Sequence, residues 1–113
     1  MDDLAQADVS TLLATLRGDD PRARDRATAA LWERWYDEKG THARRWLEHG
    51  TTLLSVERAQ DALSVFERLV VNHPDFAEAH NKKATALFIL RRHEEARVAC
   101  QETLRLNPTH FAA

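Results

Sequence analysis

A 34-residue period in the second half of the chain constrains its fold more than any other feature of the sequence. In a gapless register, six pairs of residues are identical and a seventh pair joins two small residues: Ala43 with Ala77, Gly50 with Ala84, Thr51 with Thr85, Leu53 with Leu87, Arg58 with Arg92, Ala62 with Ala96 and Pro74 with Pro108. A period of this length is typical of repeat architectures, in which each unit buries its apolar face against its neighbours.

The residue types that recur fit a unit of two antiparallel helices. A unit of this length has room for two helices of about 13 residues and two short turns. Small residues are needed where the helices cross closely, and Gly50 and Ala62 supply them in the first unit, Ala84 and Ala96 in the second. We expect larger side chains beside them to fill the space between hairpins: Trp46, Leu53, Phe66 and Leu69 in one unit, and Leu87, Cys100 and Leu104 in the other.

The segment 1–40 carries helical signals but does not follow the repeat pattern. An apolar stripe with helical spacing predicts a helix over residues 8–17, followed by a stop at Gly18. Asp20 offers an N-cap oxygen and Pro21 suits the first helical position, so a second helix is predicted from Pro21 to Lys39. Because no alternating strand pattern is found, the sequence predicts an all-α fold of about six helices in antiparallel hairpins, arranged as a right-handed helical-repeat solenoid.

The repeat residues resemble the tetratricopeptide repeat family. The first unit matches its pattern through a series of motif positions, Trp46, Gly50, Leu53, Ala62, Phe66 and Pro74. The second matches through Ala84, Leu87, Ala96 and Pro108, but has His80 at the usual Trp position and Cys100 at the usual aromatic one. His49 and Lys83 stand where an apolar residue is usual, which predicts either a snorkelling Lys and a satisfied His or a basic ledge.

The resemblance gives a domain organisation. Residues 41–76 form the first tetratricopeptide-like repeat, and residues 77–113 form the second with a short tail. Residues 1–40 weakly resemble a HEAT-type hairpin and are expected to cap the first repeat with Leu31, Trp32, Trp35 or Tyr36. The second unit is followed by Phe111–Ala113, so its last face is expected to stay uncapped and to be available for docking.

The resemblance also implies a function and a site. Members of the family bind a peptide or helix of a partner protein in a concave groove lined by the first helix of each hairpin. The matching positions in this chain are Arg44, Leu47, Thr51, Leu54, Ser55, Glu78, Asn81, Thr85, Phe88 and Ile89. These residues are expected to carry recognition, although Leu54, Phe88 and Ile89 could equally pack against neighbouring helices.

A scaffold or adaptor that binds another protein is therefore the predicted function. The alternative is a self-assembling structural module or assembly factor, with a homodimer formed through the uncapped C-terminal repeat face. The Lys and Asn with which some members clamp acidic chaperone tails are replaced by Leu47 and Thr51 in the first unit. Arg91 and Arg92 form an exposed positive pair that could contact an acidic partner.

Other classes of function find little support. The six histidines lack the clustered spacing of zinc sites, and no nucleotide fingerprint occurs, so no metal, cofactor or enzymatic activity is expected. Cys100 is expected to be a buried structural thiol rather than a nucleophile. A net charge of −2 gives no global attraction to nucleic acid, and Arg22, Arg24 and Arg26 alternate with acidic residues.

Location is predicted from the same composition. The longest apolar run is far below the ~20 residues of a membrane span, and the first residues lack the pattern of a targeting signal. A single cysteine fits a reducing compartment. A soluble intracellular protein of the cytoplasm or an organellar matrix is expected.

Overall fold

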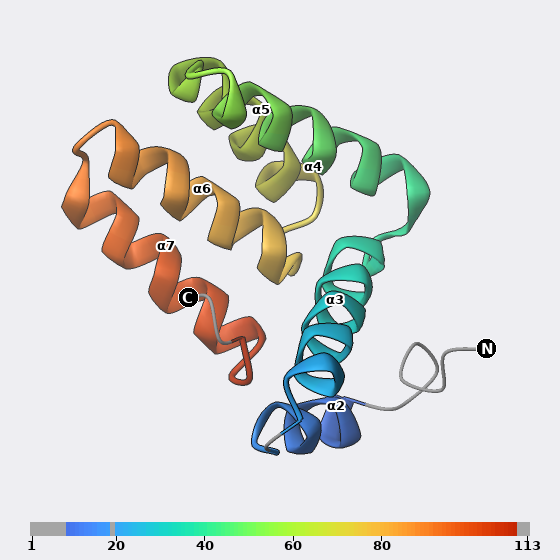
Figure 1. Ribbon diagram of the computed structural model, residues 1–113. Coiled ribbons are helices and arrows are strands. Elements are labelled where there is room, and N and C mark those ends of the chain that lie inside the picture. Colours follow the sequence, from blue (N-terminus) through green and yellow to red (C-terminus); the bar gives the residue numbers. More distant parts are fainter. Residues whose placement is uncertain (1–8, 19, 111–113) are drawn as a thin grey trace. The chain divides into compact units, whose positions relative to one another are not determined.

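The computed structural model describes residues 9–18 and 20–110, and this part of the chain is helical without strands. Its helices are α2 (Val9–Leu16), α3 (Pro21–Asp37), α4 (Gly40–Ser55), α5 (Ala59–Asn72), α6 (Ala77–Ile89) and α7 (His93–Leu106) (Figure 1). The predicted all-α fold of six helices is confirmed. Contacts divide the chain into one compact unit that ends at Tyr36 and another that begins at Asp37. Residues 1–8, 19 and 111–113, which fall within the domains predicted above, lie outside the described residues.

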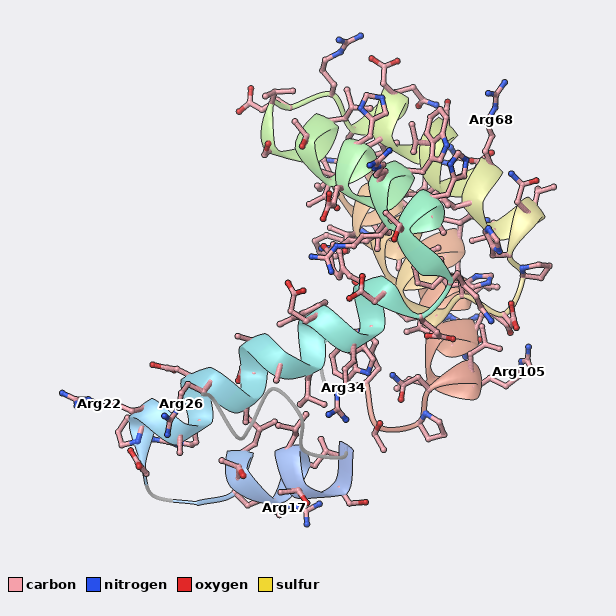
Figure 2. All side chains as sticks on the ribbon, turned by 90° about the vertical axis from the view of Figure 1, so that its right-hand side faces the viewer. Arg17, Arg22, Arg26, Arg34, Arg68 and Arg105 are labelled. Carbon is pink, nitrogen blue, oxygen red and sulfur yellow. The ribbon has the colours of Figure 1, made fainter. Side chains whose placement is uncertain are left out.

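The first unit is a small hairpin held together by α2 and α3. Asp20 Oδ1 accepts a hydrogen bond from the backbone N–H of Arg22 at 3.0 Å, which caps the start of α3 as predicted. Leu12, Ala27, Leu31 and Trp35 form its buried cluster. Leu31 and Trp35 therefore belong to the core of this hairpin, while Arg22 and Arg26 extend outward from α3 (Figure 2). The cap that these residues are expected to form over the first repeat, and the HEAT resemblance, stay predictions.

The predicted end of the second helix, Lys39, is two residues too late. Helix α3 ends at Asp37, and Gly40 adopts a φ of 87° at the start of α4. Glycine tolerates this left-handed backbone because it has no Cβ. The glycine that was expected to separate two helices is thus the first residue of the next one.

The second unit consists of two successive hairpins, α4–α5 and α6–α7. Helix α6 lies between α5 and α7 and also touches α4 (Figure 1). Its core is built from side chains that are almost completely buried: Leu47, Leu63, Phe66, Phe76 and Leu87. None of these large side chains comes from α7, which contributes smaller groups such as Ala96 and Ala99.

A close crossing in this unit joins α4 to α5. A Cβ atom at Gly50 would lie 2.8 Å from Cζ and 3.0 Å from Cδ1 of Phe66. The small residue predicted at the crossing is therefore needed, although the side chain that it accommodates is Phe66 rather than Ala62. In the second repeat, Ala84 stands at the position of Gly50 and Cys100 stands at the position of Phe66. The residue on the first helix is therefore larger than in the first repeat, and the residue on the second helix is smaller.

The turn inside each hairpin repeats with the same period as the sequence. Glu57 and Arg91 have φ values of 63° and 62°. Both values lie in the left-handed region that most side chains avoid. In the second hairpin, Arg92 N–H donates to Leu87 O at 2.9 Å and Arg91 N–H donates to Phe88 O at 3.0 Å. This pair of bonds is the Schellman pattern, which satisfies carbonyls at the end of a helix and usually places glycine at the left-handed position.

Several residues expected in the core are more exposed than predicted. Trp46 is 42% exposed and Leu104 is 41% exposed. Trp46 meets His49 edge to face at a centroid distance of 6.0 Å, whereas Leu104 lies on α7, against which α6 is the described helix that packs extensively. Cys100 is half-buried rather than buried, because it lies on the same side of α7. His49 is exposed and Lys83 half-buried.

No helix in the described part of the chain combines the length and the apolar character that crossing a membrane requires.

Candidate functional site

The residues predicted to line a groove lie on two neighbouring helices, α4 and α6. Leu47, Glu78 and Asn81 are buried, and their side chains offer no surface to a partner. The accessible members are half-buried or exposed and belong to the later turns of both helices: Thr51, Leu54 and Ser55 on α4, and Thr85, Phe88 and Ile89 on α6. We call these six residues the α4–α6 surface.

The α4–α6 surface combines apolar groups with hydroxyl oxygens. Phe88 is 64% exposed and Ile89 is 54% exposed. Two neighbouring residues at the end of α6 therefore present large apolar side chains to solvent. The Thr51 hydroxyl donates to Leu47 O at 2.8 Å, and the Thr85 hydroxyl donates to Asn81 O at 3.2 Å. Since both hydroxyl protons are engaged, the remaining lone pairs can accept hydrogen bonds from a ligand.

Glu78 and Asn81 belong to a buried polar cluster instead. Glu78 Oε2 lies 2.5 Å from Nε2 of His110, and the amide of Asn81 donates to Glu78 Oε1 at 3.3 Å. The side chains of Glu78 and His110 are fully buried. The cluster fastens the segment that follows α7 to the first turn of α6.

Arg44 occupies the position in the first repeat that Glu78 occupies in the second, yet its surroundings differ. Its guanidinium is 2.8 Å from carboxylate oxygens of both Asp37 and Glu48. It is half-buried and engaged with these acids. The charged groups at this position therefore serve the protein's own structure in both repeats.

The two arginines expected to meet an acidic partner are not equivalent. Arg92 donates two hydrogen bonds to Glu95, at 3.0 and 2.7 Å. These bonds raise the pKa of Arg92 and lower the pKa of Glu95. Arg91 is exposed and has no ion pair with any described residue, so it is the arginine of the pair whose charge is available.

None of the hollows in the second unit was predicted from the sequence. One, of about 400 Å³, is lined by Asn81, Ala84, Thr85, Phe88, His93, Ala96, Arg97 and Cys100. A smaller one, of about 120 Å³, lies beside Trp46 and Arg68 on α4 and α5. A position-by-position comparison of the two repeats could have indicated the hollow of about 400 Å³, because Arg97 stands where the first repeat has Leu63.

Candidate metal ligands do not come together in the part of the chain that the structure describes. No three side chains of His, Cys, Asp or Glu there form a group that could hold an ion. His110 faces Glu78, His80 lies 2.8 Å from Pro74 O, and His93 contacts the ring of Phe88. Cys100 is a free thiol in the larger hollow.

Comparison with known proteins agrees with this geometry. A family model described as "Tetratricopeptide repeat" matches residues 47–111, which is more than half of the chain. The matched segment contains most of α4 and all of α5, α6 and α7. No curated protein and no solved structure matches the chain significantly.

Proposed function

The chain belongs to the tetratricopeptide repeat family, and from that premise we propose that it binds a peptide or helix of another protein through the α4–α6 surface. Repeats of this family are protein-interaction modules rather than enzymes. The observation that carries the proposal is the exposure of Phe88 and Ile89 at groove positions of α6. Exposed apolar side chains next to hydroxyl acceptors suit an amphipathic helix or an extended peptide.

The α4–α6 surface defines the chemistry of the ligand. Leu54, Phe88 and Ile89 would bury apolar side chains, and Thr51 and Thr85 would accept hydrogen bonds from its N–H groups. Arg91, just beyond the end of α6, is placed to meet an acidic residue of the same ligand. No catalysis and no cofactor enter this function.

A peptide selected against the chain from a random library tests this function. Phe88→Ala should weaken its binding by about 1–3 kcal/mol, the range of an anchor residue, while the thermal midpoint of unfolding stays unchanged because the ring is mostly exposed. Val71→Ala is the matched control, since Val71 is exposed on α5, outside the α4–α6 surface. Equal effects of the two substitutions on affinity would refute the proposal.

The contribution of Arg91 is tested separately. Charge reversal at Arg91 and Arg92 together should weaken the binding of an acidic peptide. Reversal at Arg92 alone should weaken it much less, because the guanidinium of Arg92 is already paired with Glu95. Unchanged affinity in the double variant would remove both arginines from the site.

Self-assembly through the C-terminal repeat face is the alternative function, and the exposed Leu104 supports it. Light scattering across a range of concentrations distinguishes the two, because a self-assembling module gains mass without any ligand. The proposed location is intracellular, in the cytoplasm or an organellar matrix, and it is supported by the single, reduced cysteine of the chain.

A further inference from the structure

The first repeat shows what the side of a hairpin looks like when a helix covers it. Ala59, Leu63, Phe66 and Val70 lie at i, i+4, i+7 and i+11 of α5 and therefore share one face of that helix. The first three are buried and Val70 is half-buried, where α5 packs against α4 and α6. An apolar stripe of this kind is what a following hairpin requires.

The equivalent stripe on α7 has changed its chemistry. The repeat register places His93, Arg97, Cys100 and Leu104 at these positions. His93, Arg97 and Leu104 are exposed and Cys100 is half-buried, because α6 is the described helix that packs extensively against α7. We call these four residues, with Phe88 of α6, the end face.

The end face is hollow and carries positive charge. The hollow of about 400 Å³ extends between α6 and α7, with Ala84 and Ala96 among its lining residues. The Phe88 and His93 rings meet at a centroid distance of 5.1 Å at its rim. Two basic side chains, His93 and Arg97, line it beside the Cys100 thiol, whereas the residues of the first repeat that correspond to His93 and Arg97 are the apolar Ala59 and Leu63.

We propose that the end face is a second docking site, which receives an amphipathic helix of another protein with carboxylates beside a stripe of small residues. The internal precedent is α6, whose buried Ala79 and Ala86 form such a stripe and which packs against α5. The hollow can take up a few side chains of such a helix, which would lie over it, and the guanidinium of Arg97 favours an acidic one.

Arg97 already pairs with Glu94 on α7, but this ion pair still allows Arg97 to bind a carboxylate of a ligand. Arg97 donates to Glu94 at 2.9 Å, and both side chains are largely exposed. Exposed pairs of this kind contribute about 0–1 kcal/mol. An incoming carboxylate in the hollow would be less hydrated and so would interact more strongly with the guanidinium. Glu94 does not line the hollow and can stay beside Arg97.

The same charge disfavours a second copy as the occupant. A two-fold dimer would pair the end face with itself and bring two copies of Arg97 and His93 together. Like charges at such an interface oppose association. Apart from Phe88, which belongs to both surfaces, the end face lies on α7, so this proposal goes beyond the function proposed for the α4–α6 surface.

The test uses the full chain and two synthetic peptides that correspond to residues 76–90. One has the unchanged sequence, with Lys82 and Lys83 on either side of the Ala79–Ala86 stripe, and the other has Glu at both lysine positions. The readout is the rate at which N-ethylmaleimide alkylates Cys100, which is the single cysteine of the chain and is absent from both peptides. Binding at the end face covers Cys100, and because Thr85 and Phe88 of the α4–α6 surface line the same hollow, the Ile89→Ala variant below separates the two modes of binding.

We expect the acidic peptide, in large excess, to slow alkylation at least about fivefold more than the basic peptide, which corresponds to about 1 kcal/mol of binding free energy. Arg97→Glu should abolish this difference. Arg105→Glu is the matched control and should preserve it, because Arg105 is also an exposed arginine of α7 that pairs with a glutamate three residues earlier, and it points away from the hairpin (Figure 2).

Three results would overturn the proposal. In the first, the two peptides protect Cys100 from alkylation equally or not at all. In the second, the acidic peptide protects Cys100 of the Arg97→Glu variant as well as it protects Cys100 of the parent chain. Protection could also rise with protein concentration in the absence of peptide, together with a doubled mass, in which case a second copy is the occupant. Ile89→Ala, which removes an apolar group from the α4–α6 surface, should leave the protection of Cys100 unchanged, so failure of one proposal is distinguishable from failure of the other.

Discussion

Gly50→Ala tests whether the crossing of α4 and α5 depends on the absence of a single methyl group. The added Cβ would lie 2.8 Å from Cζ and 3.0 Å from Cδ1 of Phe66, well inside the roughly 3.5–4.0 Å at which carbon atoms normally meet. The Phe66 ring is fully buried, so it can move only by disturbing other core contacts. Overpacking of this kind costs about 1–3 kcal/mol, and the better helix propensity of alanine offsets about 1 kcal/mol of that cost.

A methyl group placed this close to a fully buried ring belongs in the upper part of that range, at about 2–3 kcal/mol, so the expected net result is a loss of about 1–2 kcal/mol in the free energy of unfolding. Urea denaturation followed by circular dichroism measures this loss. Phe66→Leu in the Gly50→Ala background should recover part of it, because the shorter side chain makes room for the methyl group. The double-mutant cycle should therefore give a coupling energy of about 0.5–3 kcal/mol, as residues in contact do.

Ala84→Gly provides the control at the equivalent position of the second repeat. Cys100 replaces the ring there, so no overlap is relieved, and the substitution should lose only the helix propensity of alanine, about 1 kcal/mol. A Gly50→Ala variant as stable as the parent, or an absence of coupling to Phe66, would refute the argument. Either result would mean that the two helices can separate at little cost.

Three further predictions concern stability. Arg91→Gly should raise the free energy of unfolding by about 1 kcal/mol, since it removes a left-handed side-chain residue, and denaturation of Arg91→Ala should show no such gain. Glu78→Leu should lose about 1–3 kcal/mol by removing the carboxylate that the buried His110 imidazole contacts, and a double variant with His110→Phe that is no more stable would contradict this. Lys39 lowers the pKa of Asp75 by a hydrogen bond. Asp75→Asn should therefore lower the free energy of unfolding by its full amount above the ordinary pKa of 3.8, and the loss should disappear as the pH falls through the lowered pKa. Denaturation at several pH values measures this dependence.

Helix positions and the family follow from the sequence because they depend on local spacing. The period of 34 sets where each hairpin turns, and α5, α6 and α7 fall within the two predicted repeats, as does all of α4 after its first residue. Helix ends were less accurate, since α3 ends two residues before Lys39 and α4 begins at Gly40 rather than after it. A glycine marks a change of backbone direction, but it does not say on which side of it the next helix begins.

The accessible part of the candidate site could be only partly predicted. Motif positions give the face of a helix on which a side chain lies, and Phe88 and Ile89, which they assign to the groove, are exposed on α6. They did not predict that Glu78 and Asn81 are buried, because the partner of Glu78 is His110, 32 residues away and beyond the end of α7. No local pattern connects two residues at that separation.

Differences between the repeats carry the information that the shared pattern does not. Inside the hairpins, the pair Gly50 and Phe66 of the first repeat corresponds to the pair Ala84 and Cys100 of the second. One residue of the pair is larger and the other is smaller in the second repeat, as expected where two helices must pack without a void. On the outer side of the second hairpin, Leu63 and its equivalent Arg97 exchange polarity, and no constraint of internal packing requires that change. A position that preserves volume is explained by the fold, whereas one that replaces a buried leucine by an exposed arginine needs a different explanation. Recognition of an acidic helix at the end face supplies one, and the alkylation of Cys100 measures it directly.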